Sequence, residues 1–394
     1  MKIKHKLAVL ALMPMLAFCF QSWRNISANI NENDVVDIMR RNAALVRSAS
    51  ELAAELQKER GKTSLHLAGG LDLGAVQEQR RASDGKLKAF TAALEQSRLD
   101  DKTASEASSI GETLASLRAS SLSMSGTSLR DNYAKLIKLL IDTQAGAARA
   151  PTTRGVGKVF GAIVLIETAK ENGGMFRALL SSLIAQDKRL SLDDMNLLVR
   201  FKSSLDANLN SPGLSGSEKL RPRLAEVQES DAWRDAHAAF VTVLGKWNEG
   251  GFGLDGRKVF ATITRVIDDV GAVVAQELEI SGANLEKIAG DIRQELFFSL
   301  VVFGLMLVVS LGAIVALAGA ITKPLGRGVE FAEAIRLGDL STRLRLGGKD
   351  EISRLGAALD AMADSLEGKA KAARRIADGD LTRDVELASD RDVL

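Results

Sequence analysis

Two short stretches place an arginine and several carboxylates beside glycine within a helical pattern. The first is LQKERGKTS, residues 56–64, and the second is ETAKENGGMFRALL, residues 167–180. Glycine inside a helix costs about 1 kcal/mol relative to alanine, so we expect a compensating gain, such as close approach of a neighbour or a ligand. The planar fork of an arginine suits a planar oxyanion through paired hydrogen bonds. Arg60 and Arg177 are therefore candidates for binding a small anion.

The same arginines can instead be neutralised within the protein. Glu59, Glu167 and Glu171 lie in the two stretches and can either orient these arginines or pair with them outright. Two carboxylates one helical turn apart are not in themselves a sign of acid–base catalysis. The sequence contains no phosphate loop, nucleophile elbow or metal-ligand spacing, so we expect neither enzymatic activity nor a cofactor.

The composition around these stretches favours helices over strands. Aromatic residues make up 4% of the chain and prolines number five, whereas strands need aromatic and β-branched residues. Apolar residues recur at spacings of three and four, and glycine or proline separates the segments. The clearest predicted helices cover residues 35–67, 159–184, 197–209, 220–247 and 259–292. Short connections between consecutive helices predict an all-α fold of two stacked four-helix bundles that share long helices.

Residues 296–321 contain neither a charge nor a proline. As a helix this stretch is about 39 Å long, enough to cross a hydrocarbon core of about 30 Å. The alternative is a buried core helix of a soluble protein. Basic residues at 323–327 follow the stretch and place its end in the cytoplasm, which puts residues 28–294 outside, in the periplasm of a bacterium.

A first span is predicted over residues 7–20, which are apolar except for Pro14 and follow three lysines. A cleaved signal peptide, a lipoprotein signal using Cys19 and an uncleaved signal anchor are the three alternatives. We favour the anchor, because no good cleavage site follows and Phe18 precedes the cysteine. The chain is then a multi-pass protein of the inner membrane, with membrane lipid among its partners.

Three motifs follow the second span in order: Pro324, Gly338-Asp339-Leu340 and Asp350-Glu351. Proline is tolerated in the first turn of a helix, so we expect a short helix to begin there. Asp350 is a candidate N-cap for the next helix. Apolar residues in that helix are spaced 3, 4, 3, 4, at positions 352, 355, 359, 362 and 366. This coiled-coil seam cannot be buried by one chain, so it predicts a homodimer.

The sequence resembles two known families. LQKERGKTS, QRRASDGKLKAF at residues 79–90 and ETAKENGGMFRALL resemble, in that order, the nitrate- and nitrite-sensing (NIT) domain over residues 35–290. The resemblance implies two helical bundles that bind nitrate or nitrite through arginines. Arg60 and Arg177 match the helical arginines, with Arg80 and Arg81 as further candidates, whereas the run GGMF before Arg177 departs from the family pattern.

The motifs after the second span resemble a HAMP domain, a parallel four-helix bundle built by two chains. Its signalling residues would be Pro324, Gly338, Asp339, Asp350 and Glu351. The run IRLGDL at residue 335 recurs as IADGDL at residue 376, an offset of 376 − 335 = 41, so we expect a second, incomplete HAMP-like unit. The expected domains are the N-terminus with the first span, the sensor domain, the second span, the HAMP domain and the second unit, at residues 1–27, 28–294, 295–321, 322–368 and 369–394.

Together these features predict the input half of a bacterial methyl-accepting chemotaxis receptor, whose output module would follow residue 394. Its expected partners are nitrate or nitrite outside, and a chemotaxis kinase and adaptor inside. One alternative is the input half of a sensor histidine kinase or nucleotide cyclase, and another is a membrane-anchored protein without a small ligand. A net charge of +2 gives no case for nucleic-acid binding.

Overall fold

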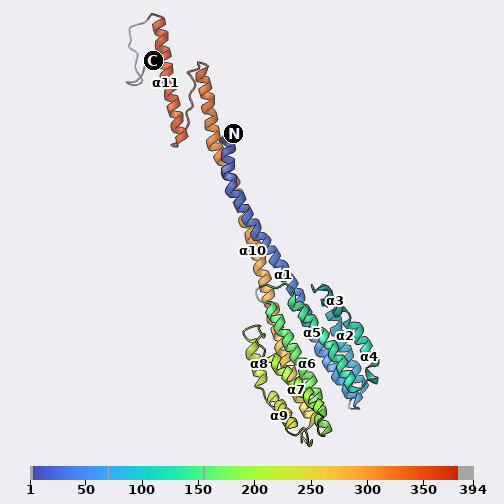
Figure 1. The fold of residues 1–394 in the computed structure, drawn as a ribbon. Helices are drawn as coiled ribbons and strands as arrows, with labels where there is room; N and C mark the ends of the chain where they lie inside the picture. Colours follow the sequence, from blue (N-terminus) through green and yellow to red (C-terminus); the bar gives the residue numbers. More distant parts are fainter. Residues whose placement is uncertain (1–2, 70, 154–155, 380–394) are drawn as a thin grey trace. The chain divides into compact units, whose positions relative to one another are not determined.

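The structure, a computed structural model, describes residues 3–69, 71–153 and 156–379, without the side chains of residues 3–12, 14 and 318. The chain divides into two units, Ala28–Glu295, and Met1–Ser27 together with Leu296–Leu394. In the described part every regular element is a helix, so the all-α prediction is confirmed (Figure 1). The helices are α1 (Ile3–Leu67), α2 (Leu73–Gln96), α3 (Asp101–Ser108), α4 (Ile110–Ser120), α5 (Gly126–Arg149), α6 (Val156–Gln186), α7 (Leu192–Leu209), α8 (Leu220–Gln228), α9 (Asp231–Gly245), α10 (Gly256–Arg336) and α11 (Glu351–Ala377), with a 3-10 turn η1 (Ser121–Ser123).

The Ala28–Glu295 unit contains a first four-helix bundle made by α1, α2, α5 and the consecutive short helices α3 and α4. Its apolar side chains recur every three or four residues along α1 and α5 and meet in one core. The largest fully buried members include Leu45, Leu52, Leu56, Phe90, Leu114 and Tyr133.

The second bundle of this unit is made by α6, α7, α9 and α10, and its core includes Phe176, Leu198, Val243 and Ile263. The two bundles lie side by side (Figure 1). The predicted pair of four-helix bundles is therefore confirmed, but stacking and shared helices are wrong, because each core draws on its own helices. α1 and α5 of the first bundle meet α6 and α10 of the second along an interface that contains charged side chains.

Side chains that satisfy free backbone groups set the helix ends. Ser191 begins α7 with a capping box, in which its hydroxyl accepts from the Asp194 N–H and the Asp194 carboxylate accepts from the Ser191 N–H. Ser230 caps α9 in the same region of the chain. The single helix predicted over residues 220–247 is therefore wrong: it divides into α8 and α9, because the Ser230 cap starts a new helix directly after Glu229.

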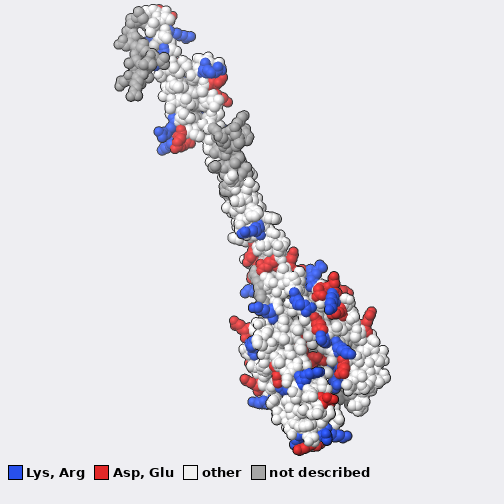
Figure 2. Space-filling model, viewed as in Figure 1, with Lys and Arg blue, Asp and Glu red and all other residues white. Residues whose placement is uncertain are grey.

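One helix in the described residues, α10, contains a stretch long and apolar enough to cross a membrane. None of its most apolar 18-residue window is buried, and Phe297, Leu305 and Val308 are each more than 60% exposed. The alternative of a soluble core helix is therefore contradicted. Charges of both signs mix over the face of the Ala28–Glu295 unit drawn in Figure 2, which fits the near-zero net charge.

The prediction of a first span over residues 7–20 rests largely on side chains outside the described part, and it stays a prediction. Among the described side chains near its end, Leu16 and Phe20 are apolar and each 62% exposed. Phe18 stacks on Phe303 of α10, with ring centroids 6.3 Å apart. This contact lies within the unit that contains both predicted spans.

The segment after the span folds back on itself. α10 continues through Pro324 to Arg336, so the prediction that a new helix begins at this proline is wrong; helix-forming residues on both sides outweigh one lost backbone hydrogen bond. Gly338 ends the helix with φ +88°, a conformation that favours glycine. Phe331, Leu344 and Ala363 form a small core between α10, the connector and α11.

The predicted motif residues hold the connector and start α11. Asp339 accepts hydrogen bonds from the Ser341 N–H and hydroxyl, at 3.0 and 2.6 Å, which keep the pKa of its carboxyl below the ordinary value. Asp350 caps α11 as predicted, accepting from the Ser353 N–H at 2.8 Å, and Glu351 lies in the first turn. Two residues of the predicted seam, Leu355 and Met362, remain 50% and 43% exposed. Of the second HAMP-like unit, residues 380–394 lie outside the described residues.

We predict that replacing the fully buried Leu52 by alanine lowers the free energy of unfolding of the Ala28–Glu295 unit, called the sensor unit below, by about 2–5 kcal/mol, because it leaves a cavity in the first core. Thermal unfolding of the full chain in detergent measures this. Leu65→Ala, on the same helix but 45% exposed, should change stability by less than about 0.5 kcal/mol. Equal losses in both variants would contradict the assigned core.

Candidate functional site

The two consecutive glycines of α6 lie where its neighbours approach closely. A Cβ atom added to Gly174 would lie 2.9 Å from Nη2 of Arg60 on α1. One added to Gly173 would lie 3.3 Å from the side chain of Ile267 on α10. The expectation that these glycines permit close approach is confirmed. They bring α6 against one helix of each bundle.

Arg60 crosses from α1 to α6 and pairs there with Glu171. Its Nη1 and Nη2 donate to the two carboxylate oxygens at 2.5 and 3.2 Å, and Nη1 also lies 3.4 Å from the sulfur of Met175. The Gln57 amide donates to the same carboxylate at 2.9 Å. The Arg60 side chain is 4% exposed, so this pair is buried between the bundles.

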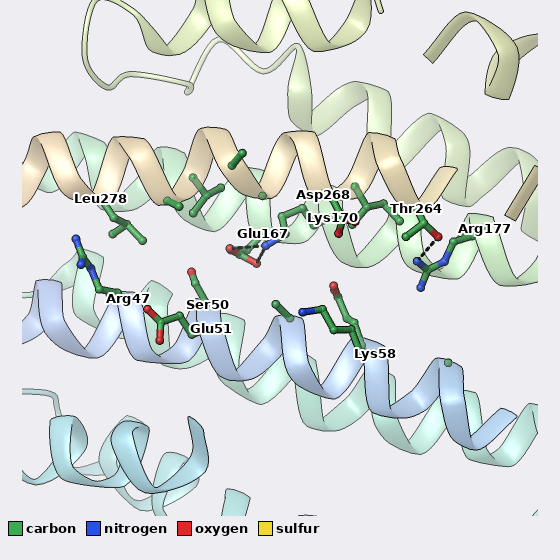
Figure 3. A pocket seen from close by; sticks show the side chains of 18 of the residues that line it. Arg47, Ser50, Glu51, Lys58, Glu167, Lys170, Arg177, Thr264, Asp268 and Leu278 are labelled. Carbon is green, nitrogen blue, oxygen red and sulfur yellow. Dashed lines mark hydrogen bonds and ion pairs between the residues drawn. The ribbon is translucent and has the colours of Figure 1, made fainter. Parts of the chain in front are cut away.

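A second buried ion pair lies one turn away on α6. The Lys170 ammonium donates to both oxygens of Glu167 at 3.0 and 3.1 Å, and the two side chains are 6% and 1% exposed. Lys170 lies against α10, because a Cβ on Gly271 would be 3.7 Å from its Cε. Figure 3 shows this pair on the floor of the cleft between α1 and α10. Within each pair the two opposite charges neutralise each other, as buried ionic groups require.

Arg177 differs from Arg60 and Lys170, because no ion pair with it occurs among the described residues. Its Nη1 donates to the Thr264 hydroxyl at 2.9 Å, and that hydroxyl in turn donates to the Phe260 carbonyl at 2.7 Å. The Phe260 ring covers one face of the guanidinium, with its centroid 4.5 Å from Cζ. The Nε atom is buried and has no hydrogen-bond partner.

The environment of Arg177 favours an anion. Burial first, and then the positive charge of Arg60, lower the pKa of Arg177 to about 10, so the group is still charged at neutral pH. An oxyanion on its free Nε–Nη2 edge would offset both effects. That edge is a two-donor fork, the geometry that pairs with planar oxyanions.

The space next to Arg177 is a half-open cleft of about 940 Å³ between α1 and α10, with α6 as its floor (Figure 3). The charged residues that line it are five cations, Arg47, Lys58, Lys62, Lys170 and Arg177, and four carboxylates, Glu51, Glu167, Asp268 and Glu279. The balance is 5 − 4 = +1, the charge that one monovalent anion neutralises. The charge of Asp268 also raises the pKa of Arg177, against the effects of burial and of Arg60.

The structure separates the other two predicted arginines from this cleft. Arg80 lies on α2, where it donates to the Ser121 hydroxyl at 2.8 Å and lies 3.7 Å from Glu59. Arg81 is exposed. Of the four candidate ligand-binding residues, Arg60 and Arg177 are thus brought together at the interface between the bundles, whereas Arg80 belongs to a polar cluster inside the first bundle.

That cluster is organised by Glu59, which is fully buried. Arg118 of α4 donates to it through Nε and Nη2 at 2.7 and 2.8 Å, and the Tyr133 hydroxyl donates at 2.9 Å. Burial and the Glu59 charge raise the pKa of Tyr133. Asp84 accepts from Arg118 at 2.5 Å and is a structural partner of this cluster.

The residues that complete these groups were not predicted from the sequence: Arg118, Tyr133, Lys170, Phe260 and Thr264. Lys170 stands between two predicted glutamates, and its i,i+3 spacing from Glu167 was a usable signal. No local pattern identifies Thr264 or Phe260, because they meet Arg177 across 87 and 83 residues of chain (264 − 177 and 260 − 177).

The fold and the cleft define a class of protein, a helical two-bundle ligand sensor with a HAMP segment after an apolar helix. The family described as "Nitrate and nitrite sensing" matches residues 51–279, and the HAMP domain matches residues 316–368. The chain belongs to the nitrate- and nitrite-sensing (NIT) family and carries a HAMP domain, in the order expected from the sequence.

A solved structure, "Structure of the NasR transcription antiterminator", has the same fold, with a TM-score of 0.60 and 16% sequence identity. The similarity covers 89% of this chain and 94% of that chain. No curated protein matches the chain. The domain content makes the protein a nitrate- and nitrite-sensing transmembrane signal transducer.

We predict that Gly174→Ala fails to stabilise the protein although alanine favours helices by about 1 kcal/mol over glycine. The new Cβ would lie 2.9 Å from Nη2 of Arg60, so the guanidinium has to shift, which weakens its contact with Glu171, a charge-assisted contact of a kind worth about 1.5–3 kcal/mol. Thermal unfolding of the full chain in detergent measures the difference. Gly161→Ala, on the same helix with nothing within 4 Å, is the control and should gain stability. Equal gains in both variants would contradict the close contact.

Proposed function

We propose that nitrate or nitrite binds directly in the cleft, at the Nε–Nη2 edge of Arg177. The supporting observation is the free, buried Nε of an arginine whose other nitrogen and one face are already engaged. Thr264 can only accept from Arg177, because its hydroxyl proton is donated to the Phe260 carbonyl. Thr264 thereby holds Nη1, and Nε and Nη2 are left as the donors for the anion in this proposal.

In this proposal Arg60 and Lys170 attract the anion by their positive charge and do not contact it. Each already has a carboxylate partner. Neither cation has to leave that partner, because its positive charge attracts the ligand from where it lies. Both side chains are buried, so their charges are screened weakly. The net charge of +1 of the residues that line the cleft favours a monovalent anion over a divalent one.

The signal passes through α10 in this account. Phe260 and Thr264, which hold Arg177, belong to the same helix that continues to Arg336 in the HAMP segment. An anion that binds one arrangement of α10 against α6 more tightly shifts the population toward that arrangement, by no more than its difference in affinity for the two. The exposed seam residues Leu355 and Met362 support a homodimer as the species that signals.

We propose that the sensor unit lies outside the cytoplasmic membrane, supported by Lys323 and Arg327 directly after the apolar stretch. For the output we favour a chemotaxis receptor acting on a kinase and adaptor, because the GDL motif repeats after the HAMP domain. A histidine kinase or nucleotide cyclase is the alternative. Migration of cells in a nitrate gradient that is lost with Arg177→Ala supports the receptor; nitrate-dependent phosphorylation or cyclic-nucleotide synthesis by the protein's own chain supports the alternative.

Calorimetric titration of the full chain in lipid nanodiscs tests the binding site. We expect nitrate or nitrite to bind, and Arg177→Ala to weaken binding about 10- to 100-fold, the value of a charged hydrogen bond or two. Arg81→Ala, an exposed arginine outside the cleft, is the control and should bind as the unmodified chain does. Absence of binding by both anions, or an unchanged affinity in Arg177→Ala, would contradict the assignment.

A further inference from the structure

The cleft is much larger than an inorganic oxyanion. Its volume of about 940 Å³ compares with about 30 Å³ for a molecule of liquid water, and pockets of about 300–1,000 Å³ typically enclose organic ligands. The room comes from small residues that face each other across it. They are Ala54 and Gly61 on α1, and Gly271, Ala272 and Ala275 on α10.

The walls beyond Arg177 are mainly apolar. On α10 the cleft is lined successively by Ile267, Val274 and Leu278, and Leu278 lies about 21 Å along the helix from Thr264. The floor there is the Lys170–Glu167 pair, in which each charge is already satisfied. Cε and Nζ of Lys170 lie about equally close to the position of a Cβ on Gly271, at 3.7 and 3.8 Å, and Glu167 neutralises the ammonium, so an apolar chain meets no unpaired charge at this floor.

We propose that the cleft also binds monocarboxylates that carry a short apolar chain. The proposal rests on the anion site proposed above, and it extends the ligand class of that site. A carboxylate has the same planar pair of oxygens as nitrate for the Nε–Nη2 fork of Arg177. Its single negative charge matches the net charge of +1 of the residues that line the cleft, and its chain lies along the apolar wall of α10.

The chain length of the ligand is the property to vary. Each fully buried CH₂ group improves affinity about fourfold, so hexanoate should bind at least tenfold more tightly than acetate even with partial burial. Calorimetry of the full chain in nanodiscs, with empty nanodiscs as the blank for partition into lipid, measures both ligands and nitrate. Arg177→Ala should weaken all three.

A variant that narrows the cleft distinguishes binding of the ligand's apolar chain from binding of its carboxylate. Ala272 is exposed and lines the cleft, so Ala272→Phe fills the space without disturbing a core. We expect it to abolish the preference for hexanoate while acetate and nitrate bind as before. Ala283→Phe, at an exposed position on the same helix outside the cleft, is the matched control and should keep the preference.

Three outcomes would contradict the carboxylate proposal, and they differ in whether the nitrate site stands. If nitrate binds but hexanoate binds no more tightly than acetate, the carboxylate proposal is wrong and the nitrate site stands. If hexanoate is preferred equally in Ala272→Phe, its chain lies elsewhere and the proposal is again wrong. If none of the three anions binds, the proposed function fails, and the carboxylate proposal fails with it.

Discussion

The structure of the sensor unit depends on the cost of placing charges between two bundles of helices. Removing an ion from water costs several kcal/mol even after relaxation, so each buried charge requires a partner. Arg60 and Glu171 meet this requirement across the interface, and Lys170 and Glu167 meet it within α6. Arg177 meets it only in part, through a hydroxyl and an aromatic face. In the proposed function an anion would supply the partner that Arg177 lacks, which is a physical basis for sensing one.

The same constraint links the two bundles mechanically. Consecutive residues of α1 enter different buried networks, because Glu59 pairs with Arg118 inside the first bundle and Arg60 pairs with Glu171 on the second. Sliding α1 along α6 would separate a buried pair, which typically costs about 3–5 kcal/mol. A few discrete arrangements are therefore favoured over continuous sliding. Nearer the end of the unit, the Arg40 guanidinium also pairs with Glu286, joining α1 to α10.

The periodic part of the fold could be predicted from the sequence, because helices with one apolar face reveal that face by spacing alone. The predictions of helix boundaries were wrong where a local sequence signal and the neighbouring residues favoured different structures. Pro324 suggested a helix start but lies inside α10, and the Ser230 cap divides a segment that looked continuous. The number of bundles was predicted, but their side-by-side arrangement depends on contacts between α5 and α6 that no spacing encodes.

Only those site residues whose type and local spacing are themselves informative could be predicted from the sequence. The glycines at 173 and 174 signalled a close approach, and the arginines signalled an anion, but which glutamate pairs with which arginine depends on the packing. Thr264 and Phe260, which orient the guanidinium, are ordinary residues of an amphipathic helix until α6 is placed against them.

An experimental structure of the full chain with bound nitrate tests most directly whether an unsatisfied arginine between the bundles is the sensor. The account predicts one planar anion in the cleft, with two of its oxygens within hydrogen-bond distance of Nε and Nη2 of Arg177, and with Arg60 still paired to Glu171. A nitrate held elsewhere on the sensor unit, with the fork of Arg177 left empty at saturation, would contradict it.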